Sequence, residues 1–65
     1  MEDVDTLKAR IKKLSTQAVQ TKMNLHDLAE DLPTNWEKIM EVAQAAYDAH
    51  QALTTARQEL ATANT

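Results

Sequence analysis

The sequence has no cysteine, no glycine and a single proline among its 65 residues. Without cysteine the chain forms neither a disulfide nor a thiolate metal site, and nothing in it points to an oxidising compartment. Without glycine it lacks the loops that hold phosphate groups, and with them most sheet-based enzyme folds. No apolar run approaches the ~20 residues of a transmembrane helix, and the acidic start argues against a secretory signal. We therefore expect a helical, cytoplasmic protein.

Charge and size narrow the function classes further. Ten acidic residues outweigh seven basic ones, and the net charge of −3 argues against nucleic-acid binding. The basic patch at residues 8–13 has no interleaved aromatic residue, so we expect it to be a solvated surface. No catalytic constellation is present, since Ser15 has no neighbouring histidine, and we expect no enzyme. A chain this short buries little apolar surface alone, which favours a homo-oligomer.

Apolar residues recur with alternating spacings of three and four on both sides of Pro33. The first series is Val4, Leu7, Ile11, Leu14, Ala18, Thr21, Leu25 and Leu28, and the second is Ile39, Val42, Ala46, Ala49, Leu53, Ala56, Leu60 and Ala63. Each series fills positions a and d of an unbroken heptad pattern, and together they are called the seam below. When the chain folds back at Pro33, the two series pair in reverse order. The sequence therefore predicts an all-α, antiparallel two-helix hairpin.

The proline also sets the expected boundaries within one domain of residues 1–65. The first helix is predicted at about 3–31, because the residue before a proline is pushed out of the α region. The turn follows at 32–35, and the second helix at about 35–62. Thr34 and Glu37 have the spacing of a capping box, which predicts that they begin the second helix.

A second apolar stripe runs down the outside of the two predicted helices. Its members are Val19, Met23, Trp36, Met40, Tyr47 and, at its end, His50. A lone hairpin covers only its seam, so this many large apolar groups indicate an interface. We expect a dimer that forms a four-helix bundle, with a tetramer as the alternative and a solvated scatter of apolar residues as the plainer interpretation. An antiparallel partner sets the basic residues 8–13 against the acidic residues 27–41.

The end of the first helix has an unusual charge pattern. Asp27, Glu30 and Asp31 occupy its last turns without a basic residue, although the helix dipole is negative there. His26 and Glu30 are one turn apart on one face, so an imidazole nitrogen and a carboxylate can converge on one ion. Asp27 can orient His26 or act as an outer ligand. The pattern indicates a metal site, and a capped, solvated acidic turn is the alternative.

The ligand types bear on the identity of the metal. Nitrogen and oxygen ligands without sulfur suit iron, nickel, zinc or manganese better than calcium or copper(I). Two ligands from one helix leave the site incomplete, so a partner chain must supply more. His50 lies about 13 Å further along the hairpin than His26 and cannot share its metal within one chain. We expect His50 to be an interface residue that forms a hydrogen bond with a neighbour.

Three stretches resemble a known family. Residues 22–33 (KMNLHDLAEDLP), Trp36-Glu37 and the residues from Val42 to Tyr47 (VAQxxY) are similar to the small Rop-like proteins encoded in nitrogen-fixation gene clusters, beside the NifX-associated protein. The similarity covers nearly the whole chain. It implies a two-helix hairpin that oligomerises, a role in nitrogen fixation and metal binding. The positions that match within LHDLAEDLP are His26, Asp27 and Glu30, and His50 lies outside the motif.

Residues and resemblance together predict an accessory protein of nitrogen fixation. It would bind a divalent transition metal (iron, nickel or zinc) through His26, Glu30 and Asp27, and aid metal handling or assembly of the nitrogenase cofactor. One alternative is a metal-free adaptor that docks nitrogenase-assembly proteins through the stripe containing Trp36 and Tyr47. Another is RNA binding, as in Rop itself, against which the negative net charge argues.

Overall fold

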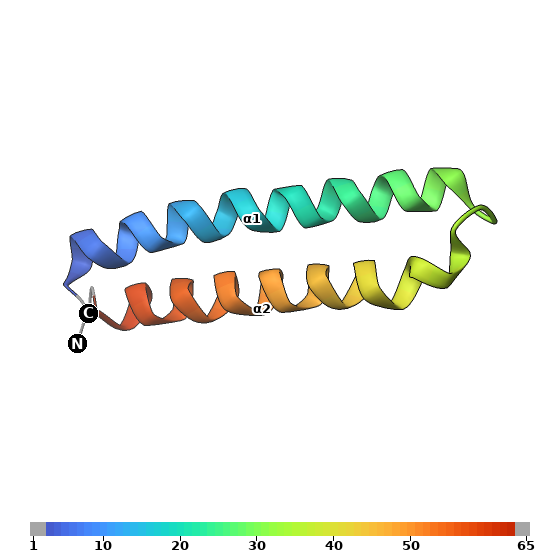
Figure 1. The fold of residues 1–65 in the computed structure, drawn as a ribbon. Coiled ribbons are helices and arrows are strands. Elements are labelled where there is room, and N and C mark those ends of the chain that lie inside the picture. The colour runs from blue at the N-terminus through green and yellow to red at the C-terminus, as the bar shows by residue number, and fades with distance from the viewer. Residues whose placement is uncertain (1–2, 64–65) are drawn as a thin grey trace.

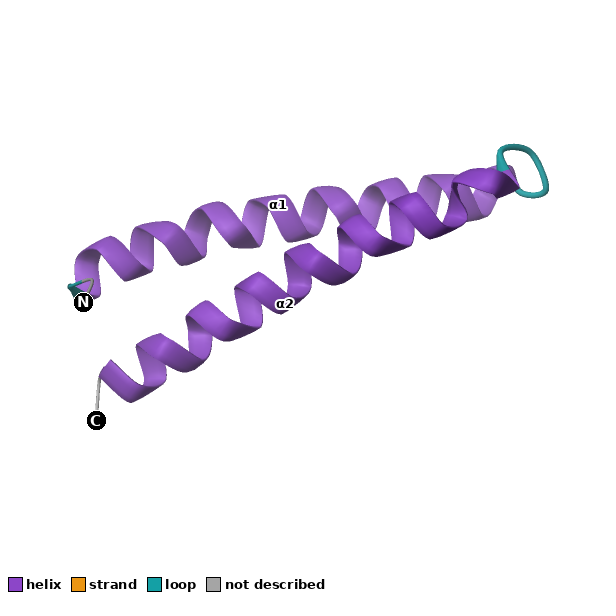
Figure 2. Cartoon of the chain, turned by 60° about the horizontal axis from the view of Figure 1, so that its bottom comes forward, coloured by secondary structure: helices purple, strands orange, loops and turns teal. Residues whose placement is uncertain are grey.

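A computed structural model describes residues 3–63 of the chain. Two helices, α1 (Val4–Asp31) and α2 (Ile39–Ala63), run antiparallel and are joined by a turn that ends in a short 3-10 helix, η1 (Trp36–Lys38) (Figure 1). The hairpin measures 47 × 15 × 15 Å, and its two arms cross at a shallow angle (Figure 2). The predicted antiparallel two-helix hairpin is thus confirmed, and its assembly into a four-helix bundle stays a prediction.

The start of α1 is fixed by an aspartate. Asp3 has an extended backbone, and its Oδ1 accepts a hydrogen bond of 2.7 Å from the backbone amide of Thr6. This bond satisfies one of the amides that have no partner in the first turn of a helix. It also holds the pKa of the Asp3 carboxyl below its ordinary value, because the hydrogen bond favours the charged form.

The core lies between the two arms. Among the described residues, the buried apolar side chains are those of Leu7, Ala18, Leu28, Ala46, Leu53 and Ala56. All of them belong to the predicted seam, and half are alanines, which let the helices approach closely. The seam also contains Thr21, whose hydroxyl donates a 2.8 Å hydrogen bond to the carbonyl of Ala18. The polar group at this position is therefore satisfied within its own helix.

The turn differs from the prediction. Asn35 precedes η1 in the left-handed conformation (φ 61°), and its side chain makes no capping hydrogen bond. The predicted capping box of Thr34 and Glu37 is therefore wrong, and the regular α-helix begins at Ile39 instead of near residue 35. Backbone carbonyls, instead of side chains, accept hydrogen bonds from amides of the turn. The hydrogen bonds run from Thr34 to Asp31 (2.9 Å), from Trp36 to Pro33 (3.3 Å) and from Lys38 to Asn35 (2.9 Å).

The end of the hairpin opposite the turn, called the open end below, carries an ion pair between the arms. Nη2 of Arg10 on α1 lies 2.7 Å from Oε2 of Glu59 on α2.

Within the part of the chain that the structure describes, neither helix is long and apolar enough to cross a membrane.

Candidate metal site

The last turns of α1 bring three potential ligands together. Nε2 of His26 lies 3.5 Å from Oε1 of Glu30, one turn further along the helix. Nδ1 of the same ring lies 3.9 Å from Oδ1 of Asp27. Each of the three side chains offers one ligand atom, and these atoms all lie within 4.8 Å of one another. The helix alone creates this cluster, because residues three and four apart share a face.

The spacing between His26 and Glu30 fits a shared ion. Nitrogen and oxygen ligands lie about 2.0–2.2 Å from zinc, so two ligands at a tetrahedral angle are about 3.4 Å apart. The observed 3.5 Å between Nε2 and Oε1 is close to that separation. Asp27 lies on the side of the other ring nitrogen, but 3.9 Å is longer than the hydrogen bond by which such a residue orients a ligating histidine. The donor set therefore suits a borderline transition metal.

The cluster is exposed and strongly acidic. The side chain of His26 is 70% exposed, and those of Asp27 and Glu30 are similarly open to solvent. The last turn of α1 has no basic residue, so its carboxylates add to the negative end of the helix dipole. A cation bound here is attracted by all of these charges. With His26 protonated instead, the same geometry gives an ordinary i,i+4 ion pair with Glu30.

The second histidine lies elsewhere. Nδ1 of His50 is 2.9 Å from the carbonyl oxygen of Ala46, one turn earlier in α2. Since a carbonyl only accepts, Nδ1 is the donor in this bond. His50 is not part of the cluster formed by His26, Asp27 and Glu30.

The predicted interface side chains remain uncovered on this single chain. The exposed fraction is 65% for Trp36, 78% for Met40 and 64% for Tyr47. Val19 and Met23 on α1 are also more than half exposed. These are large apolar groups in water on the single chain.

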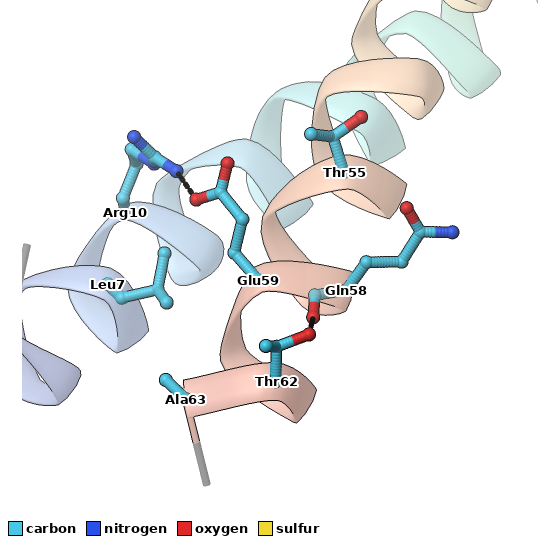
Figure 3. A pocket seen from close by; sticks show the side chains of 7 residues that line it. All are labelled: Leu7, Arg10, Thr55, Gln58, Glu59, Thr62 and Ala63. Carbon is cyan, nitrogen blue, oxygen red and sulfur yellow. Dashed lines mark hydrogen bonds and ion pairs between the residues drawn. The ribbon is translucent and has the colours of Figure 1, made fainter. Parts of the chain in front are cut away.

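Sequence reasoning missed one feature at the open end. A hollow of about 710 Å³ lies between the arms beside the Arg10–Glu59 ion pair, and Leu7, Thr55, Gln58, Thr62 and Ala63 complete its lining (Figure 3). The heptad pattern could have indicated this ion pair. The g positions, each directly before an a residue of the seam, lie on the same flank of an antiparallel hairpin. Arg10 precedes Ile11, and Glu59 precedes Leu60.

Comparison with known proteins identifies relatives of this hairpin. A UPF0437 protein of Azorhizobium caulinodans is 60% identical over 60 residues, which span 92% of this chain and 87% of that protein. A Frankia alni protein, described as a UPF0437 protein in the nifX-nifW intergenic region, is 46% identical over 48 residues, or 74% of this chain and 58% of that protein.

A solved structure and a family model agree with these relatives. An NMR structure from the Northeast Structural Genomics Consortium superimposes with a TM-score of 0.89 and is 51% identical, covering 97% of this chain and 89% of that one. The sequence model described as Rop-like matches residues 2–65. The resemblance noted in the sequence is thereby confirmed, and the chain belongs to the Rop-like family.

Proposed function

We propose that this protein is an accessory factor of nitrogen fixation that binds a divalent transition metal at the turn end of α1. In this proposal His26 and Glu30 are direct ligands, and Asp27 orients the imidazole. The protein acts by binding, as a homo-oligomer, and serves metal handling or assembly of the nitrogenase cofactor. The observation that carries the proposal is the 3.5 Å separation of Nε2 of His26 and Oε1 of Glu30.

Two further observations support it. The Frankia alni relative is described by its place between nifX and nifW, which connects that protein to nitrogen-fixation genes. In addition, α1 ends without a basic residue in its last turn, so a bound cation supplies a charge that helix ends normally take from lysine or arginine. Iron, nickel and zinc all accept this pair of nitrogen and oxygen ligands.

The proposed site is open. Two direct ligands leave at least two positions of a tetrahedral ion to water, to a second chain or to a protein that receives the metal. Because the side chains are exposed, an acceptor protein can reach the ion without unfolding the hairpin. An open, exchangeable site suits a protein that passes a metal on better than one that stores it.

Titration of the purified protein with Zn²⁺, Ni²⁺ or Fe²⁺ in a calorimeter tests this proposal. Glu30→Gln and Glu41→Gln form a matched pair, since each removes one negative charge near the turn and only Glu30 belongs to the cluster. We expect Glu30→Gln and His26→Ala to lose binding, whereas Glu41→Gln retains it. Equal loss in both glutamate variants would indicate unspecific attraction to an acidic surface and overturn the assignment.

Elemental analysis of untagged protein provides a second readout. Stoichiometric metal in the parent that is absent from His26→Ala supports the site. Metal in neither protein, with unchanged oligomeric mass, would contradict the proposal and leave the metal-free adaptor as the remaining function.

A further inference from the structure

One exposed methionine stands at an unusual position of the heptad pattern. Counted along the seam of α1, Met23 is at position f, which lies farthest from the a and d positions of the core. Its side chain is 55% exposed. The other f positions of α1 and α2 carry polar residues or alanine, namely Ala9, Thr16, Glu30, Gln44, Gln51 and Gln58. Packing between the two arms therefore does not explain a large apolar residue at this position.

The neighbours of Met23 on the helix surface belong to the candidate metal site. His26 and Asp27 follow it by three and four positions, and residues at these spacings share a face of a helix. Glu30 occupies the next f position, one heptad further along. No other methionine of the sequence has a histidine three or four residues away. The turn end of α1 therefore places a thioether beside an imidazole, a combination that the chain does not repeat.

The two side chains can reach a common ion. The Cβ atoms of residues three apart on a helix are about 5–6 Å from each other. Ligands on opposite sides of an ion, with bonds of about 2.0 Å to nitrogen and 2.3 Å to sulfur, are about 4.3 Å apart. The side chain of Met23 has three rotatable bonds. The ring of His26 is 3.5 Å from Glu30 and 3.9 Å from Asp27, and contacts this long leave it free to turn.

A thioether changes the kind of ion that is preferred. The nitrogen and oxygen atoms of His26 and Glu30 suit borderline divalent metals, whereas the soft sulfur of methionine selects copper(I). Two ligands are enough for such a monovalent ion, which binds them in a linear arrangement. The chain has no cysteine, so no thiolate competes for a soft ion. The carboxylates of Asp27 and Glu30 attract a cation of either kind.

We propose that Met23 and His26 form a second metal site, which binds a soft monovalent cation of the copper(I) class between Sδ of Met23 and one ring nitrogen of His26. This inference rests on the proposed function only in its use of His26 as a ligand. A neutral imidazole has one nitrogen with a free lone pair. His26 therefore binds either a divalent ion together with Glu30 or a soft ion together with Met23, and the two sites exclude each other.

Titration with silver(I) in a chloride-free buffer tests the second site. Silver(I) shares the ligand preference of copper(I) and keeps its oxidation state in air. Met23→Leu and Met40→Leu form a matched pair, because each replaces an exposed methionine by a residue of similar shape and helix propensity. Only Met23 adjoins a histidine. We expect Met23→Leu to weaken silver(I) binding at least about tenfold and Met40→Leu to leave it unchanged.

The same variants separate this site from the divalent one. Met23→Leu should retain the Zn²⁺ affinity of the parent, Glu30→Gln should lose Zn²⁺ and keep silver(I), and His26→Ala should lose both ions. In NMR spectra, silver(I) should shift the methyl signal of Met23 and not that of Met40.

Two results would overturn the inference: silver(I) binding by Met23→Leu that is as tight as in the parent, or an equal loss in Met40→Leu. A parent that binds silver(I) through Met23 but does not bind Zn²⁺, Ni²⁺ or Fe²⁺ would overturn the proposed divalent site and leave this second site standing. Failure of one site is thus distinguishable from failure of the other.

Discussion

Arg10 and Glu59 form an ion pair of 2.7 Å that connects the first helix to the second at the open end of the hairpin. The two residues are separated by 49 positions in the sequence. Their pairing joins the first half of α1 to the last turns of α2, as the antiparallel arrangement of the two arms requires. The side chains are 39% and 53% exposed, so solvent screens much of the attraction.

We expect this pair to contribute little to stability. A double-mutant cycle with Arg10→Ala and Glu59→Ala should give a coupling free energy of about 0.2–1 kcal/mol. This coupling should decrease in about 1 M salt, where the screening length is only ~3 Å. Urea unfolding measures it. A coupling free energy well above that range would mean that the pair is desolvated in solution, contrary to its exposure here.

The seam should dominate stability. Leu53→Ala removes a buried side chain from the middle of α2 and should lower the free energy of unfolding by about 2–5 kcal/mol. Gln51→Ala, two residues earlier on the exposed surface, should change it by less than about 0.5 kcal/mol. Similar effects of both substitutions in urea unfolding would show that Leu53 is not part of the core.

The cap of α1 should make stability depend on acid. The hydrogen bond from the amide of Thr6 lowers the pKa of the Asp3 carboxyl in the folded chain. The stabilisation of the fold by this carboxylate is therefore present above the pKa of the unfolded chain, and it is lost as the pH falls through the pKa of the folded chain. Asp3→Asn keeps an acceptor at the cap but does not titrate. Between about pH 5 and pH 2 the parent should therefore lose more stability than the variant. If the urea midpoints of the parent and of Asp3→Asn differ by the same amount at every pH, this prediction is wrong.

Metal binding should weaken on acidification. A ligating imidazole must be neutral, so protons compete with the metal for the ring nitrogen of His26 as the pH falls. Protonation would also convert the contact of His26 and Glu30 from a chelating pair into an ion pair. Competition with a chromophoric chelator measures the change in affinity.

Asp27→Asn should weaken metal binding by about 10–100-fold if Asp27 orients the imidazole of His26. The same chelator competition measures the affinity, and an unchanged affinity would remove Asp27 from the site.

Self-association should make the melting temperature depend on concentration. For a chain whose folded state is a dimer, dilution shifts the equilibrium toward unfolded monomer and lowers Tm. Trp36→Ala should flatten this dependence without removing the helices, because Trp36 lies outside the seam. A parent whose Tm is the same over a hundredfold range of concentration would indicate a monomeric fold.

The hairpin and its buried residues could be predicted from periodicity alone, since every buried apolar residue described falls on the seam. The cluster at His26 could be predicted as well, because helical spacing fixes it. The start of the second helix could not. Thr34 and Glu37 match a capping box, but the amide of Thr34, which the Glu37 side chain would bind in such a box, donates to the carbonyl of Asp31 instead. Such competition between equivalent acceptors is decided by local backbone geometry, which the residue types do not specify.

The mirror pairing of the arms about Pro33 also determines how the hairpin opens. The pairs at the turn, such as Leu28 with Ile39, join neighbouring parts of the chain, and the pair of Val4 and Ala63 joins almost its two extremes. The entropy lost in closing a loop grows with its length, so formation is easiest at the turn and each later pair extends the one before. Amide hydrogen exchange should accordingly be fastest near Arg10 and Glu59 and slow toward Leu28. The acidic turn that carries the ligand cluster would then be the first part of the chain to form and the last to come apart.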